Sequence, residues 1–241
     1  MVIDGTQART AVVFFNMVEP ETPKAFGVIV YDVAGRLVAE KKQWTTLPPR
    51  GVRRVWLRDV LDEAGVRGDF VGHAEVFYSM DTDAYPDWLH HQVHYVQKDH
   101  VEGLQVGVGL WNSPQGTRPP IPDPQGGDPR LACIPVLSNG DYSTTVALTN
   151  CSHAYDYDLE GVVALELRAG RHIVERREVA MPPHGMLFQP VRELFPRTDE
   201  HLRAHGGIGF LMVRPVNIRT FGGQFFHIQT ATGQFSTEHT F

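Results

Sequence analysis

The stretch Leu47-Pro48-Pro49, with Gly51 two residues later, returns in the second half of the chain as Met181-Pro182-Pro183, with Gly185 two residues later. The spacing is 134 residues (182 − 48 and 185 − 51). In both places the two prolines break the chain between one apolar run and the next. A break that recurs at a fixed distance indicates that the chain contains two copies of one domain.

The sequence around these breaks repeats with nearly the same spacing, so that residues 10–77 are a diverged copy of residues 144–213. The matching positions are Asn16 and Asn150, Gly27-Val28-Ile29 and Gly161-Val162-Val163, Gly35-Arg36 and Gly170-Arg171, and Arg58 and Arg192. The repeat predicts a first domain over residues 1–112, a linker over 113–135 and a second domain over 136–241. The linker holds seven prolines and three glycines, which favours an extended, semi-rigid spacer.

Each copy consists of short apolar runs separated by turn-forming residues, and no long amphipathic helix is visible. About seven short strands, with turn signals every 8–12 residues or so, are typical of a β-sandwich. The expected fold is therefore all-β, with two tandem antiparallel β-sandwich domains related by an internal repeat.

The order of these features in each copy is a strand, an Asn, a strand containing Tyr or Leu, a Gly turn, a Pro-rich break and an Arg-containing strand. It resembles the small bacterial β-sandwich modules typified by the sensory rhodopsin transducer family. The resemblance covers about 70 residues of each copy and runs through Asn16, Tyr31, Pro48 and Arg58, and through Asn150, Leu165, Pro182 and Arg192. It implies a non-enzymatic binding or scaffold module. That family typically has one sandwich per chain, so its oligomeric state and partner do not carry over.

The charge of the chain argues against polyanionic partners. Its net charge is −6, from 22 basic and 28 acidic residues, and no basic block exceeds two residues. Nucleic-acid binding and attachment to acidic membranes both need clustered Lys and Arg, so neither is expected. Residues 1–5 lack the order of a signal peptide and no apolar run is long enough to span a bilayer, so we expect a soluble, cytoplasmic protein.

No standard catalytic motif is present: the sequence has no GxSxG, CxxC, HExxH or P-loop pattern. The two cysteines, Cys133 and Cys151, do not occupy corresponding positions in the two copies and are expected to be reduced, partly buried thiols. We therefore predict no catalytic residues.

Histidines gather at the last hairpin of each copy. In the first copy, pairing Gln97 with Leu104 places Val93 opposite Val108 and Tyr95 opposite Val106, which makes one face apolar. The other face has polar side chains opposite glycines, which leave open space above the sheet. The predicted ligand-binding residues are Trp88, His90, Gln92, His94 and Trp111. The alternative is a solvated or inter-domain face.

The acidic, aromatic loop over residues 81–91 is absent from the second copy and is predicted to supply specificity. In the second copy, pairing Phe225 with His239 would place His227 and His239 on one face, about 7 Å apart. They could then share a metal such as Zn, Cu or Fe, with Glu238, His184 or His205 as a third ligand. The alternative is that His227 is a core histidine hydrogen-bonded to a backbone group or a hydroxyl.

We expect a non-enzymatic binding or scaffold protein that contacts a protein or a small-molecule ligand through its His-rich terminal hairpins. A homo-oligomer is compatible with the sequence. The alternative is a His-ligated metalloprotein or metalloenzyme that uses His227 and His239, or the His90–His94 stretch.

Overall fold

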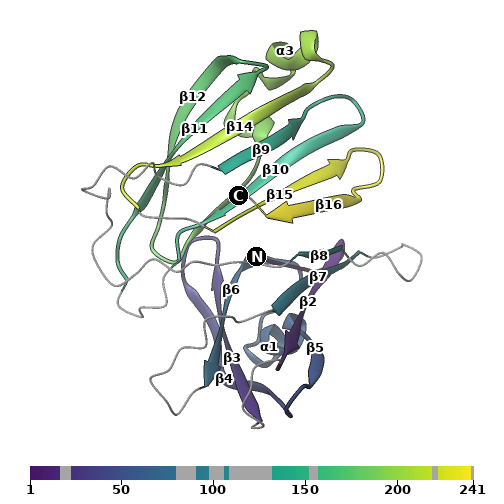
Figure 1. Cartoon of the computed structure of the whole chain (residues 1–241), viewed down its shortest axis with the longest axis vertical. Helices are drawn as coiled ribbons and strands as arrows, with labels where there is room; N and C mark the ends of the chain where they lie inside the picture. Colours follow the sequence, from purple (N-terminus) through teal and green to yellow (C-terminus); the bar gives the residue numbers. More distant parts are fainter. Residues whose placement is uncertain are drawn as a thin grey trace. The chain divides into compact units, whose positions relative to one another are not determined.

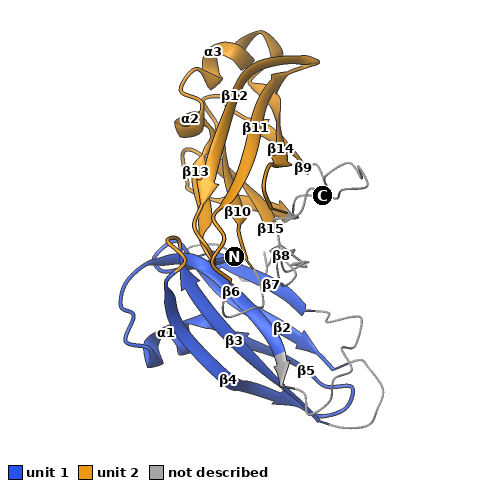
Figure 2. Ribbon diagram, turned by 90° about the vertical axis from the view of Figure 1, so that its left-hand side faces the viewer, with its two compact units in different colours: residues 1–32, 36–110 blue, residues 33–35, 111–241 orange. Residues whose placement is uncertain are grey.

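The computed structural model describes residues 1–16, 23–79, 91–97, 106–108, 132–151, 157–218 and 222–239. The chain divides into two compact units (Figure 2). Unit 1 consists of residues 1–32 and 36–110, and unit 2 consists of residues 33–35 and 111–241. Among the described residues, no helix is both long and apolar enough to cross a membrane.

Unit 1 is built from two antiparallel four-stranded sheets, with the strand orders β1-β6-β3-β4 and β5-β2-β7-β8 (Figure 1). One short helix, α1, follows β5 directly. The bounds are β1 Val2–Asp4, β2 Ala8–Phe15, β3 Lys24–Asp32, β4 Leu37–Leu47, β5 Val52–Trp56, α1 Leu57–Glu63, β6 Phe70–Ser79, β7 His91–Gln97 and β8 Val106–Val108.

The core of unit 1 is formed by alternate residues of strands from both sheets. Val12 and Phe14 of β2 are buried with Phe26 and Val28 of β3, and the rings of Phe14 and Phe26 lie 4.5 Å apart. Burying each large apolar side chain contributes about 1.5–3 kcal/mol to folding. Because side chains alternate along a strand, Ala11 and Val13 point to the opposite, outer face of the sheet.

Unit 2 also has two antiparallel four-stranded sheets, with the orders β12-β11-β14-β9 and β13-β10-β15-β16. The bounds of its strands are β9 Ala132–Leu137, β10 Tyr142–Thr149, β11 Gly161–Ala169, β12 His172–Met181, β13 Met186–Pro190, β14 Ile208–Pro215, β15 Gly222–Gln229 and β16 Phe235–His239. Its short helices are α2 Val191–Leu194, α3 Thr198–Leu202 and η1 Arg203–His205.

The two units have the same strand order. Adding eight to each strand number of unit 1 gives the order of both sheets in unit 2. The prediction of an all-β fold is confirmed. The linker prediction was too long at its end, because β9 already begins at Ala132; the preceding residues 113–131 lie outside the described residues.

The Pro-Pro break is a tight turn in both units, and a buried Asn holds each turn. In unit 1, Gly51 donates its backbone N–H to Pro48 O (2.9 Å), and the Asn16 amide nitrogen donates to Leu47 O (3.3 Å) and Pro48 O (3.0 Å). The residue before Gly51 is Arg50, with a φ of 57°. A Pro followed by a residue of positive φ is the pattern of a type II turn, in which that position favours Gly.

Unit 2 repeats this arrangement. Gly185 N–H donates to Pro182 O (2.9 Å), the Asn150 amide nitrogen donates to Met181 O (3.2 Å) and Pro182 O (3.1 Å), and His184 has a φ of 52°. The turn that the sequence predicted is therefore present in both units, with the same hydrogen bonds.

Candidate functional site

The register predicted for the first hairpin is confirmed where the structure describes both strands. Val93 lies opposite Val108, His94 opposite Gly107 and Tyr95 opposite Val106. Val93 and Tyr95 are buried, whereas Gln92 is exposed and His94 is partly exposed. β7 therefore has an apolar inner face and a polar outer face.

Two of the five predicted ligand-binding residues can be placed. His94 Nε2 lies 3.2 Å from Gln92 Oε1, so the two side chains are in contact on the outer face. The other three, Trp88, His90 and Trp111, lie outside the described residues, as does most of the loop predicted to supply specificity.

The central strand β2 brings residues of β5 onto the same outer face. Ala11 lies opposite both His94 of β7 and Trp56 of β5, and Val13 lies opposite both Gln92 and Arg54. Residues directly opposite each other in an antiparallel pair share a face. Arg54 and Trp56 thus lie in the same rows as Gln92 and His94.

Trp56 carries two guanidinium groups over its indole ring. The Cζ atom of Arg9 lies 4.6 Å from the ring centroid and that of Arg54 lies 5.0 Å from it. Arg54 precedes Trp56 by two residues on β5, whereas Arg9 precedes Ala11, the partner of Trp56, by two residues on the antiparallel β2. The two arginines therefore approach the indole from opposite directions along the strands.

Neither arginine pairs with an acid within the part of the chain that the structure describes. Arg54 is exposed and Arg9 is partly exposed, so both guanidinium groups can be reached from solvent. We call Arg9, Arg54, Trp56, Gln92 and His94 the basic face of unit 1. Arg9, Arg54 and Trp56 were not among the predicted ligand-binding residues, although the alternation of Arg54 and Trp56 within β5 could have indicated that they share a face.

The corresponding face of unit 2 has different chemistry. Thr145 of β10 lies opposite Pro190 and Phe226, and Ala147 lies opposite Phe188 and Gln224. The Phe188 and Phe226 rings pack edge to face with their centroids 6.1 Å apart, and Phe226 and Gln224 are both buried. The rows that carry Arg, Trp and His in unit 1 thus carry Phe, Pro and Gln in unit 2, and of these Phe226 and Gln224 are buried.

The register predicted for the second hairpin was wrong by one residue. His239 lies opposite Gln224 rather than Phe225, and His227 lies opposite Ser236. The loop explains the difference: Gln229 N–H donates to Gln234 O (2.7 Å), and Gly233, with a φ of 71°, closes a four-residue turn. Because faces alternate along a strand, positions 227 and 239 do not share a face, and the basis for a metal site between them is lost.

His227 has a hydroxyl partner instead. Its Nδ1 lies 3.0 Å from Thr144 Oγ1. Burial lowers the pKa of His227, and the nearby Glu238 carboxylate opposes this shift. The neutral imidazole is therefore the favoured form. No group of three or more His, Cys, Asp or Glu side chains that could hold a metal ion occurs among the described residues.

His184, a candidate third metal ligand, is buried in the Pro-Pro turn of unit 2. Its ring packs edge to face on Tyr157 with the centroids 5.6 Å apart, and Tyr157 donates its O–H to Asn150 Oδ1 (2.7 Å). Burial raises the pKa of Tyr157 to about 12, the nearby Cys151 adds to this rise, and the hydrogen bond with Asn150 opposes it. Cys151 is a buried free thiol as expected, whereas Cys133 is exposed. This cluster holds the turn.

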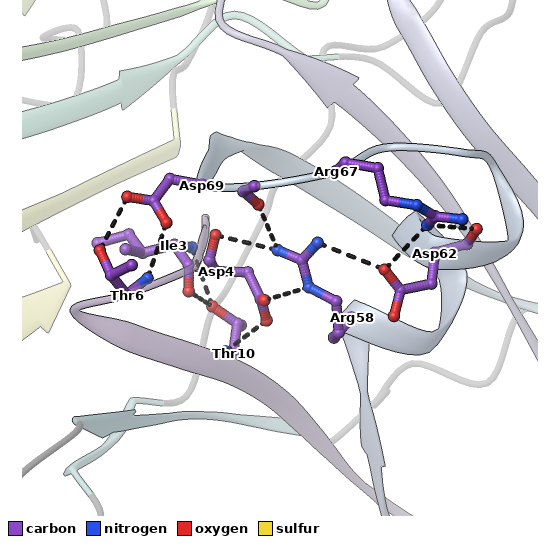
Figure 3. Close-up of polar contacts among 9 residues, drawn as sticks. Ile3, Asp4, Thr6, Thr10, Arg58, Asp62, Arg67 and Asp69 are labelled. Carbon is purple, nitrogen blue, oxygen red and sulfur yellow. Dashed lines mark hydrogen bonds and ion pairs between the residues drawn. The ribbon is translucent and has the colours of Figure 1, made fainter.

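Arg58 forms structural contacts with the first strand of unit 1 (Figure 3). Its Nε lies 2.6 Å from Asp4 Oδ1, and its Nη2 donates to Asp4 O (3.2 Å) and Gly68 O (3.0 Å). The Asp4 side chain is 1% exposed and also accepts the Thr10 backbone N–H at 3.2 Å. Arg58 thus forms a structural ion pair with Asp4. Its counterpart Arg192 is exposed.

Comparison of the chain with protein-family models, with curated proteins and with solved structures finds no match. The resemblance to transducer-like modules stays a prediction.

Proposed function

We propose that the chain is a non-enzymatic binding or scaffold protein made by duplication of one sandwich domain, and that it contacts its ligand or partner through the basic face of unit 1. Three features support the duplication: the shared strand order, the repeated Asn-held turn and the 134-residue spacing of Asn16 and Asn150. Duplication would then give two domains of the same strand order, and only unit 1 has Arg and Trp side chains in the described rows of its outer face.

The single observation that carries the binding site is the pair of guanidinium groups held against Trp56. Two arginines that lack an acidic partner among the described residues contribute little to folding, because an exposed cation–π contact stabilises by only about 0.5–1 kcal/mol. Binding uses such groups better, since aromatic and Arg side chains dominate interface energies. In unit 2, where the same rows carry no charged side chain, this chemistry is missing from the described residues.

The metal alternative has a weaker basis. A site between His227 and His239 required a register that the second hairpin does not have. The His90–His94 stretch is described only from His91 onward. We therefore do not assign a metal-dependent role to either hairpin.

A binding panel with the full chain tests the proposal. Labelled probes would include an acidic peptide, a basic peptide, a neutral glycan and a single-stranded oligonucleotide. The site variant Arg54→Ala/Gln92→Ala/His94→Ala is compared with Arg36→Ala/Arg67→Ala, which removes two exposed arginines elsewhere in unit 1. We expect at least one probe to bind the wild type and the control but to bind the site variant at least about tenfold more weakly. If every probe that binds does so equally to both variants, the face is not the site.

A further inference from the structure

We propose that the basic face recognises an extended acidic segment of a partner protein, which adds to the edge of β5 and places its carboxylates on Arg54 and Arg9. This inference rests on the proposed function, because it uses the same face and names the chemistry of its ligand. Three features support it: the donor chemistry of the face, the spacing of its cations and the edge of β5, whose neighbour among the described strands is β2 alone.

The donor chemistry selects an anion. A guanidinium group has a planar fork of N–H donors and no acceptor, and it binds a carboxylate through two parallel hydrogen bonds. Both guanidinium groups lie over the Trp56 ring, and neither pairs with an acid among the described residues, so their N–H donors can serve a ligand. The exposed Gln92 amide, whose Oε1 contacts His94, adds two further N–H donors. No acidic side chain of the described residues occupies the rows of this face.

The spacing of the cations suits alternate residues of an extended chain. The two Cζ atoms cannot be more than 9.6 Å apart, the sum of their distances of 4.6 and 5.0 Å from the Trp56 centroid. Residues i and i+2 of a strand share a face and lie about 6.8 Å apart. Two acids at alternate positions can therefore meet both guanidinium groups at once.

The aromatic ring argues against nucleic acids and sugars as the ligand. Binding of single-stranded nucleic acid depends on bases that stack on an aromatic face. Arg9 and Arg54 both lie over the ring of Trp56 and approach it from opposite directions, so the ligand meets guanidinium groups rather than a bare indole. Charge pairing, not stacking, is then the main attraction.

The edge of β5 gives an extended segment a place to bind. β5 ends its sheet in the strand order of unit 1, and its described neighbour is β2 alone. An unpaired strand edge can accept a further strand through main-chain hydrogen bonds, and side chains opposite each other then set specificity. The outer face of β5 carries Val52, which is 61% exposed, then Arg54 and Trp56. For a segment that runs parallel to β5, the preferred sequence would thus have an apolar residue followed by two acids, each at alternate positions.

Titration of a twelve-residue peptide with a Val-Thr-Glu-Thr-Glu centre into the full chain tests this inference. The comparison probes are the same peptide with Gln in place of Glu, a twelve-nucleotide oligothymidylate and a neutral glycan. We expect the acidic peptide to bind more tightly than all three, and its affinity to fall as NaCl is raised. In Arg9→Gln/Arg54→Gln, binding should weaken by about tenfold for each arginine removed.

Two further variants isolate the cause. Arg36→Gln/Arg67→Gln makes the same change in net charge at exposed arginines outside the face and should bind as the wild type does. Arg54→Lys keeps the charge but loses the fork, and should weaken binding by less than Arg54→Gln does. Because Arg54 is exposed, these changes should leave the thermal midpoint nearly unchanged, which shows that the variants fold.

The outcomes separate this inference from the proposed function. Equal binding of the Glu and Gln peptides, or tighter binding of the oligonucleotide or glycan in an arginine-dependent manner, overturns the acidic segment but leaves the face a binding site. Absence of any arginine-dependent binding overturns both. If Arg54→Gln instead self-associates without binding the peptide, the arginines protect the strand edge, and both proposals fail.

Discussion

Replacing Asn150 by Ala tests how the Pro-Pro turn is held. Its amide nitrogen lies 2.8 Å from Leu159 O, 3.2 Å from Met181 O and 3.1 Å from Pro182 O, and its Oδ1 accepts the Tyr157 O–H at 2.7 Å. Asn150 is fully buried. The substitution therefore removes a partner from three carbonyls and one hydroxyl where water does not replace it.

The magnitude follows from the number of contacts. A typical intramolecular hydrogen bond contributes about 1 kcal/mol net, and a buried polar group left unsatisfied costs about 1–3 kcal/mol. The amide nitrogen has two N–H groups for its three carbonyl contacts, so together with the Tyr157 contact it makes about three hydrogen bonds, which predict a loss of roughly 3 kcal/mol for Asn150→Ala. The matched substitution in unit 1 is Asn16→Ala, whose contacts with Leu47 O and Pro48 O alone predict a loss of roughly 2 kcal/mol or more.

The assay must assign the loss to one unit. Urea unfolding gives its size, and hydrogen exchange read by mass spectrometry gives its place, because local openings are measured segment by segment. Asn150→Ala should raise exchange in β10 and β13 before β2 and β5, and Asn16→Ala should do the reverse. Combining Asn150→Ala with Tyr157→Phe in a double-mutant cycle should give a coupling of about 1 kcal/mol.

Two results would refute this reasoning. One is a loss for Asn150→Ala of less than about 1 kcal/mol. The other is an increase in exchange that spreads equally over both units. Either would mean that the amide contacts do not determine the stability of the turn.

Three further predictions concern single side chains. Because burial lowers the pKa of His227, the stability that its neutral form provides is present above the unfolded pKa of about 6.5 and is lost as pH falls through the lower folded value. When the pH is lowered from about 7.5 to 5, the urea midpoint should therefore decrease less in His227→Tyr than in the wild type. His172→Tyr, at an exposed position, should show the same decrease as the wild type. Arg58→Met leaves the buried Asp4 carboxylate without its cation and should lower the free energy of unfolding, measured in urea, by about 3 kcal/mol. Arg192→Met, at an exposed position, should lower it by less than about 0.5 kcal/mol. Equal losses would mean that the ion pair between Arg58 and Asp4 does not stabilise unit 1. Arg50→Gly relieves a positive φ at an exposed site and should raise the free energy of unfolding by about 1 kcal/mol. His184→Gly should instead lower the free energy of unfolding, because the His184 ring also packs on Tyr157. A higher free energy of unfolding for His184→Gly would show that this packing contributes little.

The two hairpins show how far local patterns fix register. In the first hairpin, the alternation of Val93 and Tyr95 with polar residues selects one register, because any one-residue shift would bury His94. In the second hairpin, Phe225 and Phe226 are both buried, so hydrophobicity does not choose between registers. The four-residue turn that ends at Gly233 determines the register of this hairpin, and the pattern of apolar and polar residues does not reveal the conformation of that turn.

By itself the sequence determined the class of the fold, the Pro-Pro turns, the inner face of the first hairpin and two polar residues of the basic face, Gln92 and His94. These features depend on neighbours a few residues apart, so periodicity and turn residues reveal them. Only the tertiary structure brought Arg9, Arg54 and Trp56 to the same face. The reason is that β2 pairs with β5 on one side and β7 on the other, and these strands are separated by tens of residues in the chain. Strand order, set by packing of the two sheets of the unit, therefore decides which side chains share the basic face.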